Sequence, residues 1–60
     1  MLKANDRIAW RYKGNKGYSD GFIKETKGKM LEIAGSRFGI GQWLNSEEIE
    51  IEILEKASSI

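Results

Sequence analysis

Near its C-terminal end the 60-residue chain runs Glu48-Ile49-Glu50-Ile51-Glu52-Ile53-Leu54. Charged and β-branched residues alternate here, which is typical of a strand with one buried side and one side facing water. We therefore expect a strand over residues 48–54, with its isoleucines inward and its glutamates outward. Asn45 and Glu48 also fit a capping box, which would start a longer helix. That alternative stays open, although β-branched residues favour the strand.

Four further segments precede this one and are separated by glycine-bearing turns. Gly21, inside the second of them, indicates a bulge, a bend or a close backbone approach. We expect strands over residues 7–12, 18–26, 30–34 and 38–44, and a single helical turn over residues 45–47. Five short strands without proline predict one all-β domain, a small barrel or a tightly curled sheet. The barrel would occupy about residues 6–54, and residues 56–60 would form a frayed tail.

The chain contains no cysteine and no histidine, so neither a disulfide nor a histidine–cysteine metal site can support a small core. Its eight isoleucines and six aromatic residues must therefore pack densely, with Trp10 and Trp43 expected inside. If this core is marginal, homo-oligomerisation is the remaining route to stability.

No apolar run is long enough to span a membrane, and residues 1–10 lack the apolar centre of a signal peptide. We therefore expect a cytoplasmic protein with no membrane partner. The net charge of +1 predicts no general affinity for polyanions. The charge is segregated along the chain, however. Residues 1–43 hold nine Lys or Arg and four Asp or Glu, whereas residues 44–60 hold one Lys and five Glu.

A group of short motifs resembles the SH3-like barrels of the Tudor type. The motifs are Asp6-Arg7-Ile8, Tyr18-x-x-Gly21-x-Ile23, Trp43 and Ile49-x-Ile51. In that family pattern an aromatic residue opens the second strand, a small residue follows three positions later, and a β-branched residue stands two positions further on. The resemblance implies a five-stranded SH3-like barrel with a one-turn helix before the last strand. It implies a fold more than a function, because this barrel serves many functions.

The same resemblance implies an aromatic pocket, since Tudor-type domains can line one with residues placed as Tyr12, Tyr18 and Phe38 are here. Lys13, Lys16 and Arg37 lie close to these residues in the sequence. Such a mixture of rings and cations could hold a cation or stack the bases of a single-stranded nucleic acid. The alternative is that the rings close one end of the barrel, and that the lysines only keep the turns soluble.

The sequence contains few of the residues on which catalysis usually depends. Without histidine or cysteine there is no base for a serine nucleophile, and the glutamates of residues 48–52 are expected on a solvent-facing side. We expect no enzyme activity, no metal and no cofactor. The leading hypothesis is a binding module associated with single-stranded nucleic acid. The alternative is a protein-interaction adaptor or small accessory subunit that binds through a strand edge or the acidic last strand.

Overall fold

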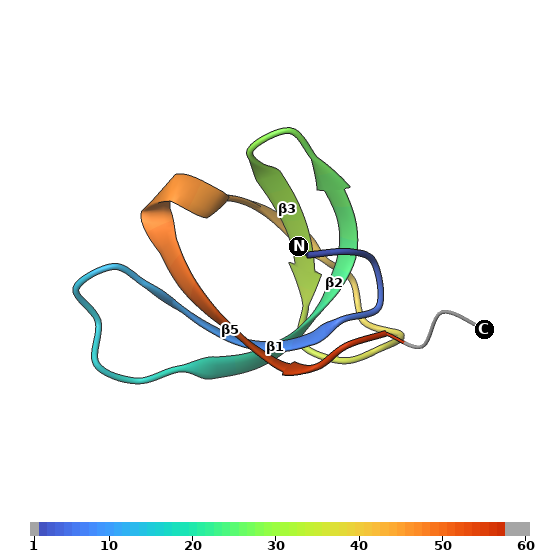
Figure 1. The fold of residues 1–60 in the computed structure, drawn as a ribbon, viewed down its shortest axis with the longest axis horizontal. Helices are drawn as coiled ribbons and strands as arrows, with labels where there is room; N and C mark the ends of the chain where they lie inside the picture. Colours follow the sequence, from blue (N-terminus) through green and yellow to red (C-terminus); the bar gives the residue numbers. More distant parts are fainter. Residues whose placement is uncertain (1, 58–60) are drawn as a thin grey trace.

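The computed structural model describes residues 2–57, and its five strands form one antiparallel sheet (Figure 1). The strands are β1 (Arg7–Tyr12), β2 (Ser19–Lys27), β3 (Met30–Ala34), β4 (Gln42–Asn45) and β5 (Ile49–Glu55). A single 3-10 turn, η1 (Ser46–Glu48), joins β4 to β5, and the Asn45 side chain accepts a hydrogen bond from the N–H of Glu47 at 2.9 Å. The predicted all-β fold is confirmed, and the last element is the strand rather than the longer helix.

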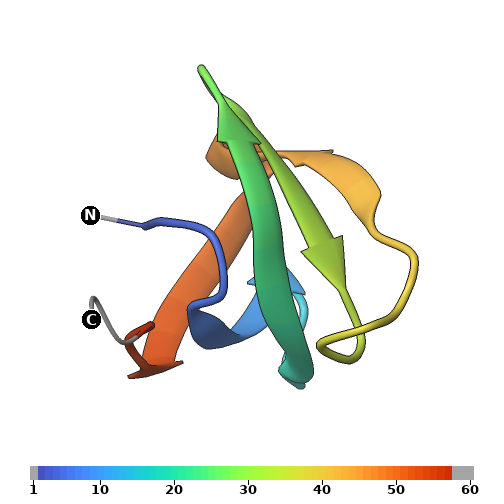
Figure 2. The same ribbon diagram turned by 90° about the vertical axis from the view of Figure 1, so that its right-hand side faces the viewer.

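The order of strands across the sheet is β4-β3-β2-β1-β5, so the last strand returns to lie beside the first (Figures 1 and 2). The longest strand, β2, has two partners: residues 19–22 pair with β1, and residues 22–27 pair with β3. This change of partner curls the sheet around its inner face. β4 and β5 are the two edges and are not paired with each other, so the sheet is curled but open.

Gly21 makes the curl sterically feasible. A Cβ atom at this position would lie 2.8 Å from Cγ2 of Ile33 and 3.3 Å from Cδ1 of Trp10. Carbon atoms do not approach so closely, so any side chain here would push β3 or Trp10 away from the backbone of β2. The close approach predicted at Gly21 is confirmed.

The core lies on the inner, concave face of the sheet. Its buried members are Ile8, Ile23, Leu31, Ile33, Leu44 and Ile49. Trp10 is half-buried and packs against this cluster, whereas Trp43 is 43% exposed. The prediction of a core position for Trp43 is wrong, because successive side chains of β4 alternate and Leu44 is the one that turns inward. Trp43 therefore lies on the outer face, opposite Glu32.

Burial falls along β5. Ile49 is 4% exposed and Ile51 is half-buried, but Ile53 is 37% exposed. The glutamates at positions 48, 50 and 52 are exposed, as the alternation predicted. The prediction that Ile53 is buried is wrong, because the second half of β5 lies at the open edge of the sheet with β1 as its only neighbouring strand.

Asp6 is a buried charge that joins the segment before β1 to the segment after β5. Its Oδ2 accepts a hydrogen bond from the N–H of Lys3 at 3.0 Å, and its Oδ1 accepts one from the N–H of Ala57 at 2.7 Å. The hydrogen bond from Ala57 is the main reason that the pKa of Asp6 is lowered, against the opposing effect of burial. Ala57 belongs to the segment predicted to fray, and it is held here; residues 58–60 of that segment lie outside the described residues.

We expect the cost of truncating an isoleucine to fall along β5. Ile49→Ala should lower the free energy of unfolding by about 2–5 kcal/mol, because it removes atoms from the buried cluster. Ile53→Ala should lower it by about 1 kcal/mol or less, because that side chain already contacts water. Urea denaturation followed by circular dichroism measures both values. Equal losses would contradict the placement of β5 at an open edge.

We expect Asp6 to make stability depend on acid pH. Its pKa is lower in the folded protein than the ordinary 3.8, so its contribution is complete above that value and is lost as the pH falls through the lowered pKa. Asp6→Asn should unfold at lower urea concentration at pH 7. The asparagine side chain has one accepting oxygen, and its NH₂ group cannot accept the second of the two N–H hydrogen bonds. The variant should also lose this part of the acid dependence. Asp20→Asn, at an exposed aspartate, is the matched control and should keep it.

Candidate functional site

The six residues predicted to form one basic and aromatic surface lie in two separate places. They are Tyr12, Lys13, Lys16, Tyr18, Arg37 and Phe38. The first four belong to the hairpin formed by β1, β2 and the turn between them, and the last two belong to the loop between β3 and β4. In Figure 1 the hairpin turn forms the far left of the molecule, whereas the loop after β3 lies at the lower right. The structure does not bring the six together.

The division of β2 between two partners explains this separation. Ala34, the last residue of β3, pairs with Phe22 in the middle of β2. The β1–β2 ladder continues past that point to the pair of Trp10 and Ser19. Tyr18 therefore lies four residues of extended chain beyond Phe22, roughly 13 Å. The loop after β3 starts beside Phe22 and therefore lies far from the hairpin turn.

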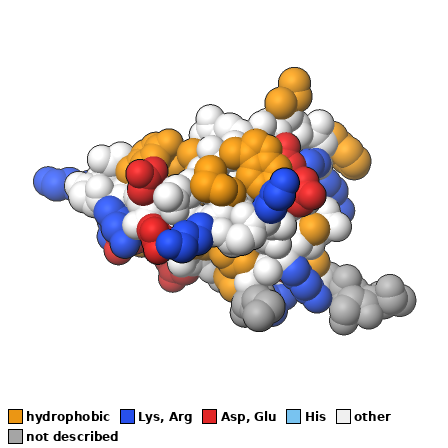
Figure 3. Space-filling model, turned by 90° about the horizontal axis from the view of Figure 1, so that it is seen from above, with side chains coloured by type: hydrophobic (Ala, Val, Ile, Leu, Met, Phe, Trp, Pro, Cys, Tyr) orange, Lys and Arg blue, Asp and Glu red, His pale blue; other side chains and the backbone are white. Residues whose placement is uncertain are grey.

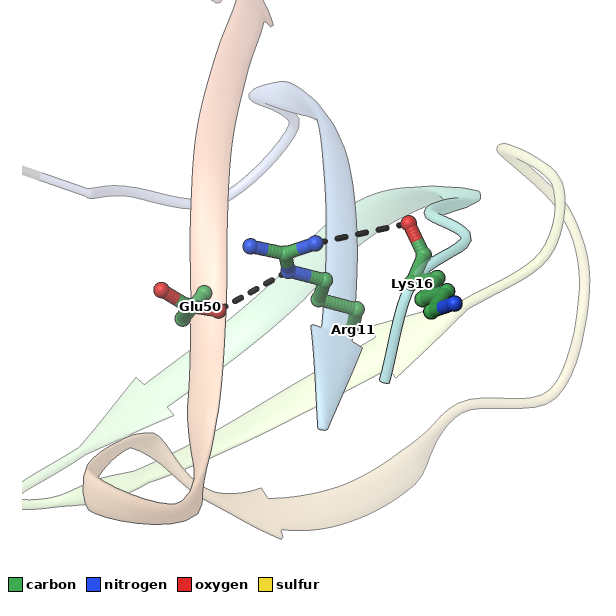
Figure 4. A network of polar contacts seen from close by, with 3 residues as sticks. All are labelled: Arg11, Lys16 and Glu50. Atoms are coloured by element: carbon green, nitrogen blue, oxygen red, sulfur yellow. Dashed lines mark hydrogen bonds and ion pairs between the residues drawn. The ribbon is translucent and has the colours of Figure 1, made fainter. Parts of the chain in front are cut away.

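At the hairpin, one arginine organises what we call the hairpin surface. This surface consists of Arg11, Lys13, Lys16 and Tyr18. Tyr12 is not part of it, because its side chain lies on the other face of β1, where the centre of its ring is 5.4 Å from that of Trp10. The guanidinium carbon of Arg11 lies 4.5 Å from the centre of the Tyr18 ring. Nε of Arg11 donates a hydrogen bond to Glu50 at 2.8 Å, and Nη1 donates one to the carbonyl oxygen of Lys16 at 3.3 Å (Figure 4). Arg11 was not among the predicted site residues, although it alternates with Trp10 and Tyr12 and so shares one face of β1 with Arg7.

The charge of the hairpin surface is mixed. Lys13 and Lys16 are exposed and make no ion pair with the described residues, but the charge of Arg11 is shared with Glu50. Pairing of β5 with β1 also sets Glu55 opposite Arg7. The separation of charge along the sequence is thus largely cancelled in space, and Figure 3 shows both signs intermixed with hydrophobic side chains on one face.

The loop between β3 and β4 carries the most exposed large hydrophobic side chains. Phe38 is 92% exposed and Ile40 is 98% exposed. Below them the loop is held in place, because the N–H of Gly39 donates to the carbonyl oxygen of Ser36 at 3.1 Å and the guanidinium of Arg37 lies 5.7 Å from the Phe22 ring. We call Phe38 and Ile40 the loop surface. Ile40 was missed because the fourth strand was predicted to start at residue 38, whereas it starts at Gln42.

A shallow groove of about 290 Å³ borders the loop surface. Its apolar lining comes from Trp10, Ile33, Ala34 and Ile40, and its polar lining comes from the start of β2 and from Gln42. Ile40 forms part of the rim, so the exposed side chain and the groove make one continuous apolar area. Such an area can receive a hydrophobic side chain of another molecule.

Acidic side chains form no cluster suited to a metal ion within residues 2–57, because no three carboxylates of this part of the chain come close enough together to hold one. A hollow of about 490 Å³ is lined by Asn5, Arg37, Glu55, Lys56 and Ala57 and carries charges of both signs. No helix in the described part of the chain is long and apolar enough to cross a membrane.

Comparison of the chain with protein-family models, with curated proteins and with solved structures finds no match.

Proposed function

We propose that this protein is a non-catalytic protein-interaction module that contacts its partner through the loop surface and the adjoining groove. The observation that carries the proposal is the near-complete exposure of Phe38 and Ile40. Burying one such side chain against a partner contributes about 1.5–3 kcal/mol. Neither residue contributes to the core of its own chain, so the benefit of these two hydrophobic positions lies in contact with another molecule.

The form of the loop supports this proposal. A binding loop loses less entropy on association when its conformation is already set. The hydrogen bond from Lys24 Nζ to the carbonyl oxygen of Arg37 ties the loop to β2. Gly41, at the other end of the loop, is covered by the side chain of Glu32 and leaves no room for a Cβ atom, which would lie 2.5 Å from Cγ of Glu32. The loop is anchored at both ends while Phe38 and Ile40 project.

The proposal includes a finer description of the fold and of the location. We take the curled sheet to be an open version of the SH3-like barrel, supported by the return of β5 beside β1 and by the single 3-10 turn before β5. An experimental structure in which β5 pairs with a strand other than β1 would contradict this description of the fold. We also retain the cytoplasm as the location, which imaging of a tagged copy tests.

We expect the double variant Phe38→Ser, Ile40→Ser to lose its protein partners. Wild type, this variant and Leu54→Ser, a control at another exposed hydrophobic residue, would be used to capture proteins from nuclease-treated lysate of the source cells. A partner identified with wild type should bind the loop variant at least tenfold more weakly in a purified titration, which corresponds to about 1.4 kcal/mol. Urea denaturation should show unchanged stability, because both residues are exposed. Equal binding by wild type and the loop variant would contradict the proposal.

The hairpin surface supports a second candidate function, binding of single-stranded nucleic acid. The supporting observation is the Arg11 guanidinium over the Tyr18 ring, with Lys13 and Lys16 exposed beside it. A base could stack on the uncovered ring face while the lysines contact phosphates, each stacked base contributing about 1–3 kcal/mol. Because Arg37 and Phe38 lie elsewhere and Tyr12 lies on the other face of β1, this candidate now rests on three of the six residues first predicted.

We expect a labelled single-stranded oligonucleotide to bind with a salt dependence of about −0.7 in log–log slope for each phosphate contacted. Lys13→Ala with Lys16→Ala should flatten the slope by one or two contacts' worth, whereas Tyr18→Ala should lower affinity with little change in slope. Lys27→Ala, at an exposed lysine on β2, and Phe38→Ser are controls and should change neither. Absence of binding at low salt would eliminate this candidate.

A further inference from the structure

The outer edge of β5 is a free hydrogen-bonding edge. β5 is the last strand in the sheet order, and within residues 2–57 it pairs only with β1. The N–H of Lys13 donates to the carbonyl oxygen of Glu48 at 3.0 Å, which fixes the alternation of the ladder. In an antiparallel pair, every second residue bonds to the neighbouring strand and the residues between them direct their N–H and C=O groups away from it. Residues 48, 50 and 52 therefore bond toward β1, and Ile51 and Ile53 present their backbone groups to the outside.

The side chains along this edge define what a further strand would have to carry. Ile51 and Ile53 lie on the inner face and are incompletely buried, whereas Glu50 and Glu52 are exposed on the outer face. Side chains directly opposite each other in adjacent strands share one face and interact. An added strand would thus place one set of residues beside the isoleucines and the alternate set beside the carboxylates.

β1 already shows the complementary pattern on the other side of β5. Arg11 stands opposite Glu50 and forms an ion pair with it at 2.8 Å, and Trp10 stands opposite Ile51. Glu52, by contrast, stands opposite Ala9 and makes no ion pair with the described residues. Glu52 is therefore the carboxylate that can form an ion pair with a cation of a strand added at the outer edge.

A second copy of the chain fits this edge poorly. A symmetric antiparallel pair of β5 strands centred on Ile51 would set Glu50 of each copy opposite Glu52 of the other. One centred on Glu52 would set that residue opposite its own copy. Like charges directly opposite each other destabilise a strand pair. The glutamates therefore oppose self-pairing of β5 in these two registers.

We propose that the outer edge of β5 receives an extended segment of a partner protein in which Lys or Arg residues alternate with apolar residues. The segment adds a strand to the sheet: its backbone bonds to Ile51 and Ile53, its cations face Glu50 and Glu52, and its apolar side chains cover the exposed parts of the isoleucines. This mode of recognition is strand addition at a sheet edge. It uses a surface other than Phe38 and Ile40 and goes beyond the function proposed above.

The test uses a labelled eight-residue peptide of alternating lysine and valine, titrated into the isotope-labelled protein and followed by amide chemical shifts and hydrogen exchange. We expect the amides of Ile51 and Ile53 to shift and to gain protection from exchange. Glu52→Lys should weaken binding at least fivefold at low salt, while Glu25→Lys, at an exposed glutamate of β2, should not. A peptide that is N-methylated on the amides expected to bond to Ile51 and Ile53 keeps its charge and should bind at least tenfold more weakly.

Several results would overturn the proposal. One is a peptide of the same composition in shuffled order that binds equally well, because charge alone would then explain the affinity. Others are shifts confined to residues away from β5, or no binding at low salt. Protection of Ile51 and Ile53 that rises with protein concentration in the absence of peptide would assign the edge to a second copy. Phe38→Ser with Ile40→Ser should leave peptide binding unchanged, so this proposal and the loop proposal can fail separately.

Discussion

Position 21 has no room for a side chain, and this steric limit governs the shape of the molecule. Because a Cβ atom there would lie 2.8 Å from Ile33, only glycine lets β3 and Trp10 approach the middle of β2. One strand can then pair with β1 over its first half and with β3 over its second. A single sheet thereby encloses its own core, so that a chain of 60 residues needs neither a second layer nor a covering helix.

The same curvature separates the hairpin surface, the loop surface and the outer edge of β5 from one another. It carries the hairpin away from the loop after β3, and it leaves β5 paired on one side only. Pairing β5 with β1 also sets glutamates of the acidic end of the chain opposite arginines of its basic beginning. The three surfaces proposed for binding are therefore local features: a ring covered by a guanidinium, two projecting hydrophobic side chains, and a strand edge bordered by carboxylates.

The alternation in residues 48–54 was sufficient to predict a strand, because its period does not depend on the rest of the fold. Which residues of an alternating strand are buried also depends on what lies beyond them. Ile53 is exposed since no described strand lies beyond β5, and Trp43 is exposed since the curl of the sheet turns the other face of β4, with Leu44, toward the core. The single patch was predicted because the first turn and the loop after the third strand can meet at one end of an SH3-like barrel, whereas here β2 changes partner between them and keeps them apart. Asp6 was recognised only as part of a motif, since its role requires an N–H group 51 residues away.

The carboxylate of Asp6 has a topological consequence. It accepts hydrogen bonds from Lys3 and from Ala57, so the chain enters and leaves the sheet at one point. A short linker could join these two positions without crossing the core, and new termini could then be opened in the exposed turn between β1 and β2. The order of strands along the chain is therefore separable from their order in space: the sheet could be circularly permuted, or inserted as a unit into a loop of another protein, with the bonds between its strands preserved.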